Sequence, residues 1–237
     1  HPSAHACSVM AAVVIRDAAI AAGAPEDCIQ WLDLKSMYAT TALMKHPGVA
    51  TILATGGNAM VAAAYSCGKP ALGVGAGNVP AYVEKTCVLP RAVNDIVLSK
   101  SFDNGMICAS EQAAIVDTEI YDAFMKEIKR FKVYFVNKEE KAKLETFMFG
   151  AVAYSDNVNA AKLNPNVVGK PATWIAEQAG FKVPEDTQIL LAECKEVGPN
   201  EPLTREKLSP VLAILKATST EDGINKSAAM VAFNGLG

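Results

Sequence analysis

The sequence predicts an α/β fold, in which short apolar strands alternate with helices. Compact apolar runs of strand length recur along the chain, and segments with helical spacing of their apolar residues separate them. Such alternation is typical of a layered α/β architecture. The chain has 237 residues, of which 51% are hydrophobic and 20% charged, so it can bury a large core as one big or two modest domains.

The chain opens with a predicted helix that begins at Ser3 or His5 and runs through Ala22, an Ala-rich run that ends at Gly23. A short strand is expected over residues 28–33. Ser36 suits the N-cap position of a second helix, which runs to about Lys45.

A strand, a glycine turn and a helix come next. Residues 49–54 form an apolar run of strand length, Thr55-Gly56-Gly57 forms the turn, and a helix continues through Tyr65. Such a turn can present helical N–H groups to a phosphate. The pattern is not the GxGxxG of dinucleotide sites, and taken alone an ordinary strand-to-helix turn is the commoner explanation.

The middle of the chain leads from a glycine-rich stretch to a helix. A strand over residues 71–74 runs into the stretch that contains Gly75, and residues 82–84 are expected to be extended. A helix over residues 89–100 follows. We place the domain change here, with residues 1–97 as the first domain and residues 98–237 as the second.

The second part of the chain alternates again. Strands are expected over residues 113–116, 133–136, 189–192 and 211–215, and helices over residues 120–130, 138–147, 171–179 and 220–230. Residues 157–169 and 193–208 are expected to be mostly connecting loops.

One cysteine, Cys108, lies between a glycine turn and a short polar segment in the stretch FDNGMICASEQ, residues 102–112. A thiol of ordinary pKa is only a few per cent thiolate at neutral pH, so a nucleophilic cysteine needs an electropositive or amide-rich setting. Gly105 lets the backbone turn closely, so that amide groups could face the sulfur and a developing oxyanion. From this stretch alone, a buried structural cysteine explains Cys108 equally well.

Three stretches together resemble the CoA-acylating aldehyde dehydrogenases: FDNGMICASEQ, ATGGNAMVAAAYSCGKPALGVGAGNVP upstream and EKLSPVLAI downstream. The similarity is greatest to the aldehyde dehydrogenase half of the bifunctional aldehyde-alcohol dehydrogenases, and it covers nearly the whole chain in order. It implies part of a Rossmann-type dinucleotide-binding domain followed by an α/β catalytic domain. Because both ends look cut, we expect an internal fragment of a longer protein, poorly active by itself.

The resemblance also implies roles for single residues. Cys108 would be the catalytic nucleophile, and the cofactor-binding residues would be Thr55, Gly56, Gly57, Gly75 and Glu206, with Glu206 holding the nicotinamide ribose. Taken alone, Glu206 would be an ordinary exposed glutamate. The implied reaction converts a small aldehyde, NAD and coenzyme A reversibly to acyl-CoA and NADH, through a thioester on Cys108.

The resemblance further bears on the final acceptor of the acyl group. Hydrolytic aldehyde dehydrogenases use a glutamate to activate water, and Val74 stands at that position. Glu84 and Glu111 remain as alternative bases, although they lie on other segments. Water is therefore expected to be a poor acceptor. Hydrolytic aldehyde oxidation and a non-catalytic module remain the alternatives.

The composition narrows the classes of partner that the sequence predicts. A net charge of −3 without a lysine or arginine cluster gives no nucleic-acid footprint, and no apolar run reaches about 18 residues, so no membrane span is expected. The six cysteines lack CxxC pairs, which indicates reduced thiols in a cytoplasmic protein, and three histidines are too few for most metal sites. The parent protein is expected to be a homo-oligomer.

Overall fold

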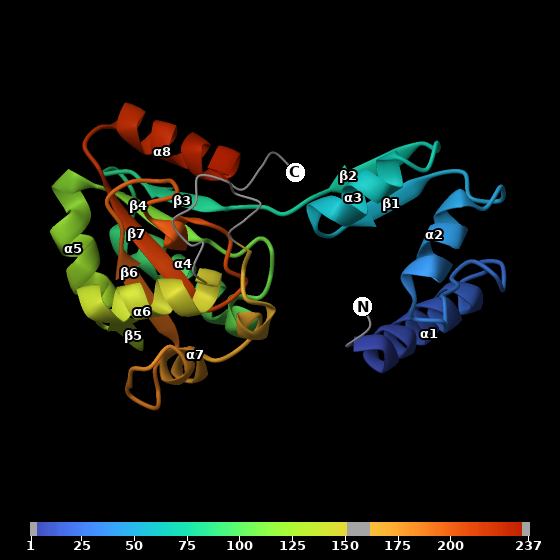
Figure 1. Ribbon diagram of the computed structural model, residues 1–237, viewed down its shortest axis with the longest axis horizontal. Coiled ribbons are helices and arrows are strands. Elements are labelled where there is room, and N and C mark those ends of the chain that lie inside the picture. The colour runs from blue at the N-terminus through green and yellow to red at the C-terminus, as the bar shows by residue number, and fades with distance from the viewer. Residues whose placement is uncertain (1–3, 151–161, 234–237) are drawn as a thin grey trace. The chain divides into compact units, whose positions relative to one another are not determined.

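A computed structural model describes residues 4–150 and 162–233 of the chain, which forms two compact units, His1–Val74 and Gly75–Gly237 (Figure 1). The units divide between Val74 and Gly75, earlier than the domain change that we placed after residue 97. Helix α4 (Leu89–Ser101) belongs to the core of the second unit, through Val93 and Val97. A functional boundary near residue 97 stays a prediction.

The first unit contains a strand–helix–strand element. The unit comprises helices α1 (His5–Ala21), α2 (Met37–Lys45) and α3 (Asn58–Tyr65) and strands β1 (Ile52–Thr55) and β2 (Ala71–Val74). The strand–helix–strand element is β1-α3-β2. The two strands are parallel, with Ile52 opposite Ala71, and α3 connects them. Ala64 of α3 packs with Ile52 and Ala54 in a small core.

The strand predicted over residues 28–33 is wrong. These residues form turns and irregular chain, and no strand of the described part of the chain pairs with them. Two side chains of this segment form a local hydrogen bond, in which Trp31 Nε1 donates to Asp33 Oδ1 at 3.1 Å. A short apolar run without a partner strand cannot bury its backbone groups, so it stays at the surface.

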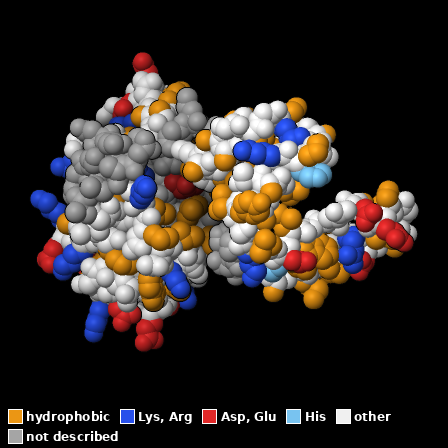
Figure 2. Space-filling view, turned by 45° about the vertical axis from the view of Figure 1, so that its right-hand side comes forward, with side chains coloured by type: hydrophobic (Ala, Val, Ile, Leu, Met, Phe, Trp, Pro, Cys, Tyr) orange, Lys and Arg blue, Asp and Glu red, His pale blue; other side chains and the backbone are white. Residues whose placement is uncertain are grey.

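Most of the large apolar side chains that stay exposed belong to the first unit (Figure 2). They lie on helices and strands alike, as Val14 of α1 at 61% exposure and Leu53 of β1 at 76% illustrate. Large exposed apolar patches are rare on monomeric proteins, and where they occur they often mark a surface that contacts another part of the protein or another protein.

The second unit is built on five parallel strands in the order β3-β4-β7-β6-β5. The strands are β3 (Pro80–Val83), β4 (Ala113–Asp117), β5 (Val133–Phe135), β6 (Ile189–Glu193) and β7 (Val211–Ala217). The other helices of this unit are α5 (Thr118–Ile128), α6 (Lys138–Phe149), α7 (Ala172–Gln178) and α8 (Thr220–Phe233). The predicted α/β fold is confirmed, and apart from residues 28–33 each expected strand is found within a few residues.

Helices cover both faces of this sheet (Figure 1). In β4, Ala113 and Ile115 face the core shared with α6, α7 and α8, whereas Ala114 and Val116 face the core shared with α4 and α5. Because successive strand residues point to opposite faces, a strand covered on both sides must be apolar throughout. This is why β4, β6 and β7 are apolar except for one charged residue near the carboxyl end of each strand.

Side chains that cap the first turn fix where two of the helices begin. Ser36 accepts a hydrogen bond from the Ala39 amide at 3.0 Å, as the sequence predicted for α2. Asn137 accepts from the Glu140 amide at 3.0 Å, and the Glu140 carboxylate accepts from the Asn137 amide at 2.9 Å, which completes a capping box at α6. The expected loop over residues 157–169 lies partly outside the described residues.

The strand order brings three distant segments to one edge of the sheet. Strands β3, β4 and β7 are neighbours, and each follows a segment that contains Gly77, Cys108 or Glu206. The strands are parallel, so their amino ends meet at the same edge. The candidate nucleophile and the candidate ribose carboxylate therefore lie on adjacent loops.

Candidate active site

The turn before Cys108 has an unusual backbone conformation. The 3-10 element η2 (Phe102–Gly105) follows α4, and Asp103, Asn104 and Gly105 all have positive φ, between 48° and 64°. Aspartate, asparagine and glycine are the residues that tolerate this region best. The Ser110 amide then donates to the Ile107 carbonyl at 3.0 Å, so Cys108 lies within a tight turn, and it is exposed.

Gly105 is needed for contact as well as for conformation. A Cβ atom at this position would lie 2.6 Å from the Ser209 carbonyl oxygen and 3.0 Å from the Lys100 carbonyl oxygen. Only glycine lets the nucleophile turn approach the backbone of the loop that carries Glu206 so closely.

Gly169 holds the same two segments together through its backbone. Asn104 Nδ2 donates to the Gly169 carbonyl at 3.0 Å, and the Gly169 amide donates to the Leu208 carbonyl at 3.1 Å. Gly169 thus links the turn before Cys108 with the loop after Glu206.

Glu206 is partly buried, not an ordinary exposed glutamate. Burial raises the pKa of its carboxyl group, and a hydrogen bond from the Gly77 backbone together with the charges of Lys207 and Lys100 opposes that rise. A Cβ atom on Gly77 would lie 3.9 Å from the Cys108 carbonyl oxygen. Gly77 therefore contacts Glu206 and lies beside the Cys108 backbone.

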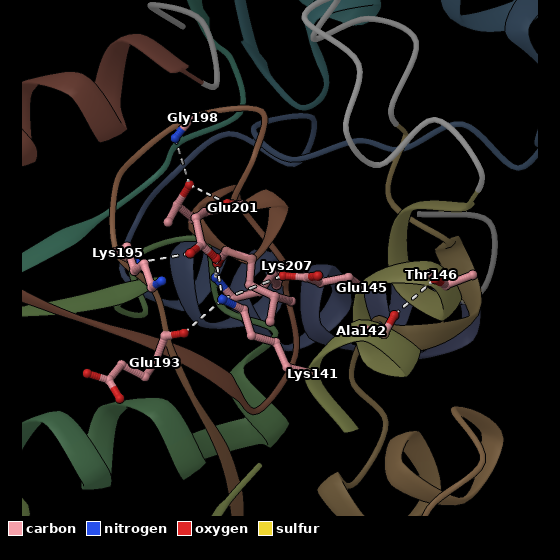
Figure 3. A network of polar contacts seen from close by, with 11 residues as sticks. Lys141, Ala142, Glu145, Thr146, Glu193, Lys195, Gly198, Glu201 and Lys207 are labelled. Carbon is pink, nitrogen blue, oxygen red and sulfur yellow. Dashed lines mark hydrogen bonds and ion pairs between the residues drawn. The ribbon is translucent and has the colours of Figure 1, made fainter. Parts of the chain in front are cut away.

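A polar network anchors the loop that carries Glu206 (Figure 3). Lys141 of α6 pairs with Glu201 and donates to the Glu193 carbonyl at 2.8 Å, and the Lys195 amide donates to Glu201 at 3.0 Å. The Thr204 hydroxyl donates to the Glu201 carbonyl at 2.7 Å. The side chains of Lys141 and Glu201 are only 17% and 11% exposed, so this end of the loop is held within the protein.

The predicted dinucleotide turn lies in the first unit. Gly57 is the N-cap of α3, and no side chain caps that helix end. A Cβ atom on Gly57 would meet nothing within 4 Å, and Thr55 and Gly56 are exposed as well, so the turn is open to a ligand. Gly75 is the first residue of the second unit, which also contains Cys108 and Glu206.

The residues weighed as bases for water differ in their places. Val74 ends β2 with an exposed apolar side chain. Glu84 lies beyond the carboxyl end of β3, the opposite end from Gly77, and there it accepts from the Thr86 amide at 2.8 Å. Glu111 lies between Cys108 and β4, and its Oε2 atom is buried without a hydrogen-bond partner among the described residues. Glu111 therefore stays the alternative base.

Sequence reasoning missed Gly77, Gln112 and Lys207. Gly77 stands in the glycine-rich stretch that was noticed for Gly75, so that stretch was a usable signal. Lys207 and Gln112 are fully buried, although both are polar and lie next to predicted loops. Their burial follows from the strand order, which no local pattern contains.

Within residues 4–150 and 162–233, no group of three or more His, Cys, Asp or Glu side chains is arranged to hold a metal ion. None of the helices there is both long and apolar enough to span a bilayer.

An exposed cysteine in a tight turn, beside a partly buried carboxylate at one edge of a parallel sheet, defines a candidate thiol-nucleophile site of an α/β protein. The sequence profile of the aldehyde dehydrogenase family matches residues 2–229. The chain belongs to the aldehyde dehydrogenase family.

Its relatives carry related descriptions. The chain is 69% identical over 237 residues to aldehyde-alcohol dehydrogenase 2 of Entamoeba histolytica, covering all of this chain and 27% of that protein. An acetylating aldehyde dehydrogenase from Geobacillus thermoglucosidasius matches with a TM-score of 0.89 and 42% identity, over 99% of this chain and 50% of that one. The predicted resemblance to the aldehyde dehydrogenase half of bifunctional aldehyde-alcohol dehydrogenases is confirmed.

A third relative was solved with a ligand bound and its cysteine modified. Rhodopseudomonas palustris propionaldehyde dehydrogenase with bound CoA and an acylated cysteine matches with a TM-score of 0.78 and 30% identity, over 90% of this chain and 46% of that chain. The present chain spans about a quarter of the length of the curated relatives and about half that of the solved chains.

Proposed function

We propose that this chain is the cysteine-bearing part of a CoA-acylating aldehyde dehydrogenase within a bifunctional aldehyde-alcohol dehydrogenase. The parent protein would convert a small aldehyde, NAD and coenzyme A to acyl-CoA and NADH, and would run in reverse. The observation that carries the proposal is the meeting of Cys108, Gly77 and Glu206 on loops that precede three neighbouring parallel strands.

Cys108 supplies the nucleophile in this proposal. Its thiolate adds to the aldehyde carbon to give a thiohemiacetal, whose oxyanion backbone amides of the turn can stabilise. Loss of the hydride leaves an acyl thioester on Cys108. The thiolate of coenzyme A then adds to the thioester carbonyl and expels the Cys108 thiolate, so the enzyme returns to its starting state.

Two features, each within its own unit, have chemistry that suits a dinucleotide: Glu206 in the second unit, and the open turn at Thr55, Gly56 and Gly57 in the first. A carboxylate can accept hydrogen bonds from two ribose hydroxyls at once, and the uncapped start of α3 suits a phosphate. A bound nicotinamide dinucleotide supplies the hydride acceptor. Gly75 would leave room near the nicotinamide end.

Coenzyme A is favoured over water as the acceptor. Val74 cannot act as a base, and Glu84 lies beyond the far end of β3. General-base help is commonly worth about 10²–10⁴-fold in rate, and a thiol needs less of it than water.

Product analysis tests the proposal. The full-length protein is given aldehyde and NAD with and without coenzyme A, and the products are separated. We expect acyl-CoA with coenzyme A and little free acid without it. Free carboxylic acid at an equal steady-state rate without coenzyme A would refute the acylating assignment and would turn attention to Glu111 as the base.

Thiol reactivity tests the non-catalytic alternative. Cys7, Cys28 and Cys108 are all exposed, so accessibility alone does not separate them. A catalytic Cys108 should be alkylated faster than the other two, and equal rates would favour a non-catalytic module.

We also propose a homo-oligomeric, cytoplasmic parent protein that works in fermentation. The exposed apolar side chains of the first unit support further protein contacts there (Figure 2). All six cysteines are free thiols, as suits a reducing compartment. Light scattering of the full-length protein tests the oligomer.

A further inference from the structure

Lys207, the residue next to Glu206, is fully buried and fully hydrogen-bonded. Its Nζ atom donates to the carbonyls of Leu203 at 2.6 Å, Arg205 at 2.9 Å and Gln112 at 2.9 Å. An ammonium group has three N–H donors, so these three carbonyls use all of them. Two of the bonds fold the loop onto itself and the third ties it to the segment that carries Cys108.

Gln112 is the other half of this connection. Its Oε1 atom accepts from the Lys207 amide at 3.0 Å and from Lys100 Nζ at 3.3 Å, while its Nε2 donates to the Ser110 carbonyl at 3.0 Å. Its own amide donates to the Val79 carbonyl at 2.7 Å. Gln112 is therefore hydrogen-bonded to the backbone of three segments: the turn after Cys108, the stretch after Gly77 and the loop of Glu206.

Burying a lysine at this place is costly. Burial lowers the pKa of Lys207 to about 7, whereas the three carbonyl acceptors favour its protonated form. An apolar side chain of similar length would fill the space without that cost. The carbonyl contacts are what a lysine adds, and all of them fix the backbone beside Glu206.

We propose that Lys207 and Gln112 are positioning residues, which together set the place of the Glu206 carboxylate relative to Cys108. The inference rests on the proposed function, because it takes Glu206 as the group that holds the cofactor. Lys207 fixes the loop at the residue next to Glu206, and Gln112 fixes that loop to the nucleophile segment. Displacing either contact moves the cofactor away from the thiohemiacetal carbon, and a shift of about 1 Å can cost about 10²-fold in rate.

A double-mutant cycle in the full-length protein tests the proposal. NADH affinity is measured for the wild type, Lys207→Met, Glu206→Ala and the double variant. We expect Lys207→Met to weaken binding about tenfold in the wild-type background and less than about twofold in the Glu206→Ala background, because residues that act through one another are not additive. Equal effects in both backgrounds would overturn the proposal.

Gln112→Met provides the second variant. It removes the Oε1 acceptor but leaves the three carbonyl contacts of Lys207 in place. The burst of NADH formation, normalised to titrated Cys108 thiol, should fall at least about tenfold. A burst within twofold of wild type would overturn the role of Gln112. If neither Lys207→Met nor Gln112→Met folds, the contacts serve folding and the proposal fails.

Two controls separate positioning from loss of stability and from failure of the proposed function. Ile128→Ala opens a cavity in the core that α4 and α5 share with the sheet, changes none of the hydrogen bonds of Lys207 or Gln112 given above, and should leave NADH affinity and the burst per titrated thiol unchanged. The hydride step is common to acylating and hydrolytic enzymes, so the burst stays informative even if the wild type produces free acid. A wild type with no aldehyde oxidation would refute the proposed function, whereas the binding cycle would still report on Lys207.

Discussion

Cys108 and Cys194 carry the same thiol in opposite surroundings. Cys194 is buried, and burial raises its pKa to about 12, so it stays protonated at neutral pH. Cys108 is exposed in a tight turn. A nucleophile must be reached by its substrate, so the exposed Cys108 suits this role and the buried Cys194 does not.

We predict that Cys108→Ala abolishes aldehyde oxidation by the full-length protein, by at least about 10³-fold in kcat, because no other group can form the covalent intermediate. Cys194→Ala should instead lower the free energy of unfolding by about 1 kcal/mol with turnover largely kept. Steady-state assays and urea unfolding measure the two effects. Turnover of Cys108→Ala within a few-fold of wild type would remove Cys108 from the mechanism.

Gly105 gives a second prediction at this scale. Gly105→Ala places a methyl group against the Ser209 and Lys100 carbonyls at a φ of 64°, so it should cut kcat by more than about tenfold and cost about 2 kcal/mol of stability. Gly180→Ala is the matched control, since Gly180 has a φ of 88° but no atom within 4 Å of an added Cβ. It should cost about 1 kcal/mol and leave kcat intact. Equal kcat values for both variants would contradict the role of the contact.

The loop of Glu206 is held in place by buried side chains and not by regular secondary structure. It contains the 3-10 turn Pro202–Thr204 and little other regular structure, yet Glu201, Thr204 and Ser209 are all buried. The Lys141–Glu201 pair joins this loop to α6 in a nearly buried place (Figure 3). Side-chain contacts therefore hold this loop against the rest of the second unit.

We predict that Glu201→Gln lowers the free energy of unfolding by about 2 kcal/mol, because Lys141 loses the charge of its nearly buried partner. Glu119→Gln is the control, since the Glu119 pair with Lys85 is 2.8 Å long but its side chains are 71% and 48% exposed. That change should cost much less than Glu201→Gln, because solvent screens an exposed pair. Urea unfolding monitored by tryptophan fluorescence measures the free energy of unfolding of both variants. Equal losses would show that the Lys141–Glu201 pair does not stabilise the loop more than an exposed pair does.

The elements themselves were largely predictable from the sequence. The buried strands β4, β6 and β7 are apolar over most of their length, and Ser36 caps the start of α2 as expected. The loop of Glu206 was expected to be a loop, but its polar sequence gave no sign of burial. Which loops meet depends on the order β3-β4-β7-β6-β5, which differs from the order along the chain. Gln112 and Lys207 could therefore not be found from local patterns.

At the scale of the whole molecule, cofactor binding should depend on protein outside this chain. The solved relative from Geobacillus is about twice as long as the part that this chain matches. We predict that the chain as printed binds NADH at least about tenfold more weakly than the full-length protein, because a dinucleotide site in an open α/β sheet needs several neighbouring strands. Fluorescence titration of both proteins measures this, and equal affinities would show that the chain holds the complete site.

Strand β7 lies between β4 and β6, so it joins the pair β3-β4 to the pair β6-β5. Among the described residues it is the last strand along the chain, and Glu206 lies just before it. A ribosome adds about 5–20 residues per second, so roughly 5–20 s pass between the synthesis of Cys108 and that of Glu206. During that time the nascent chain has a thiol but no second half of its site. The arrival of this central strand joins the two strand pairs and brings the loop of Glu206 beside the turn of Cys108, so these two parts of the candidate site come together only after β7 is made.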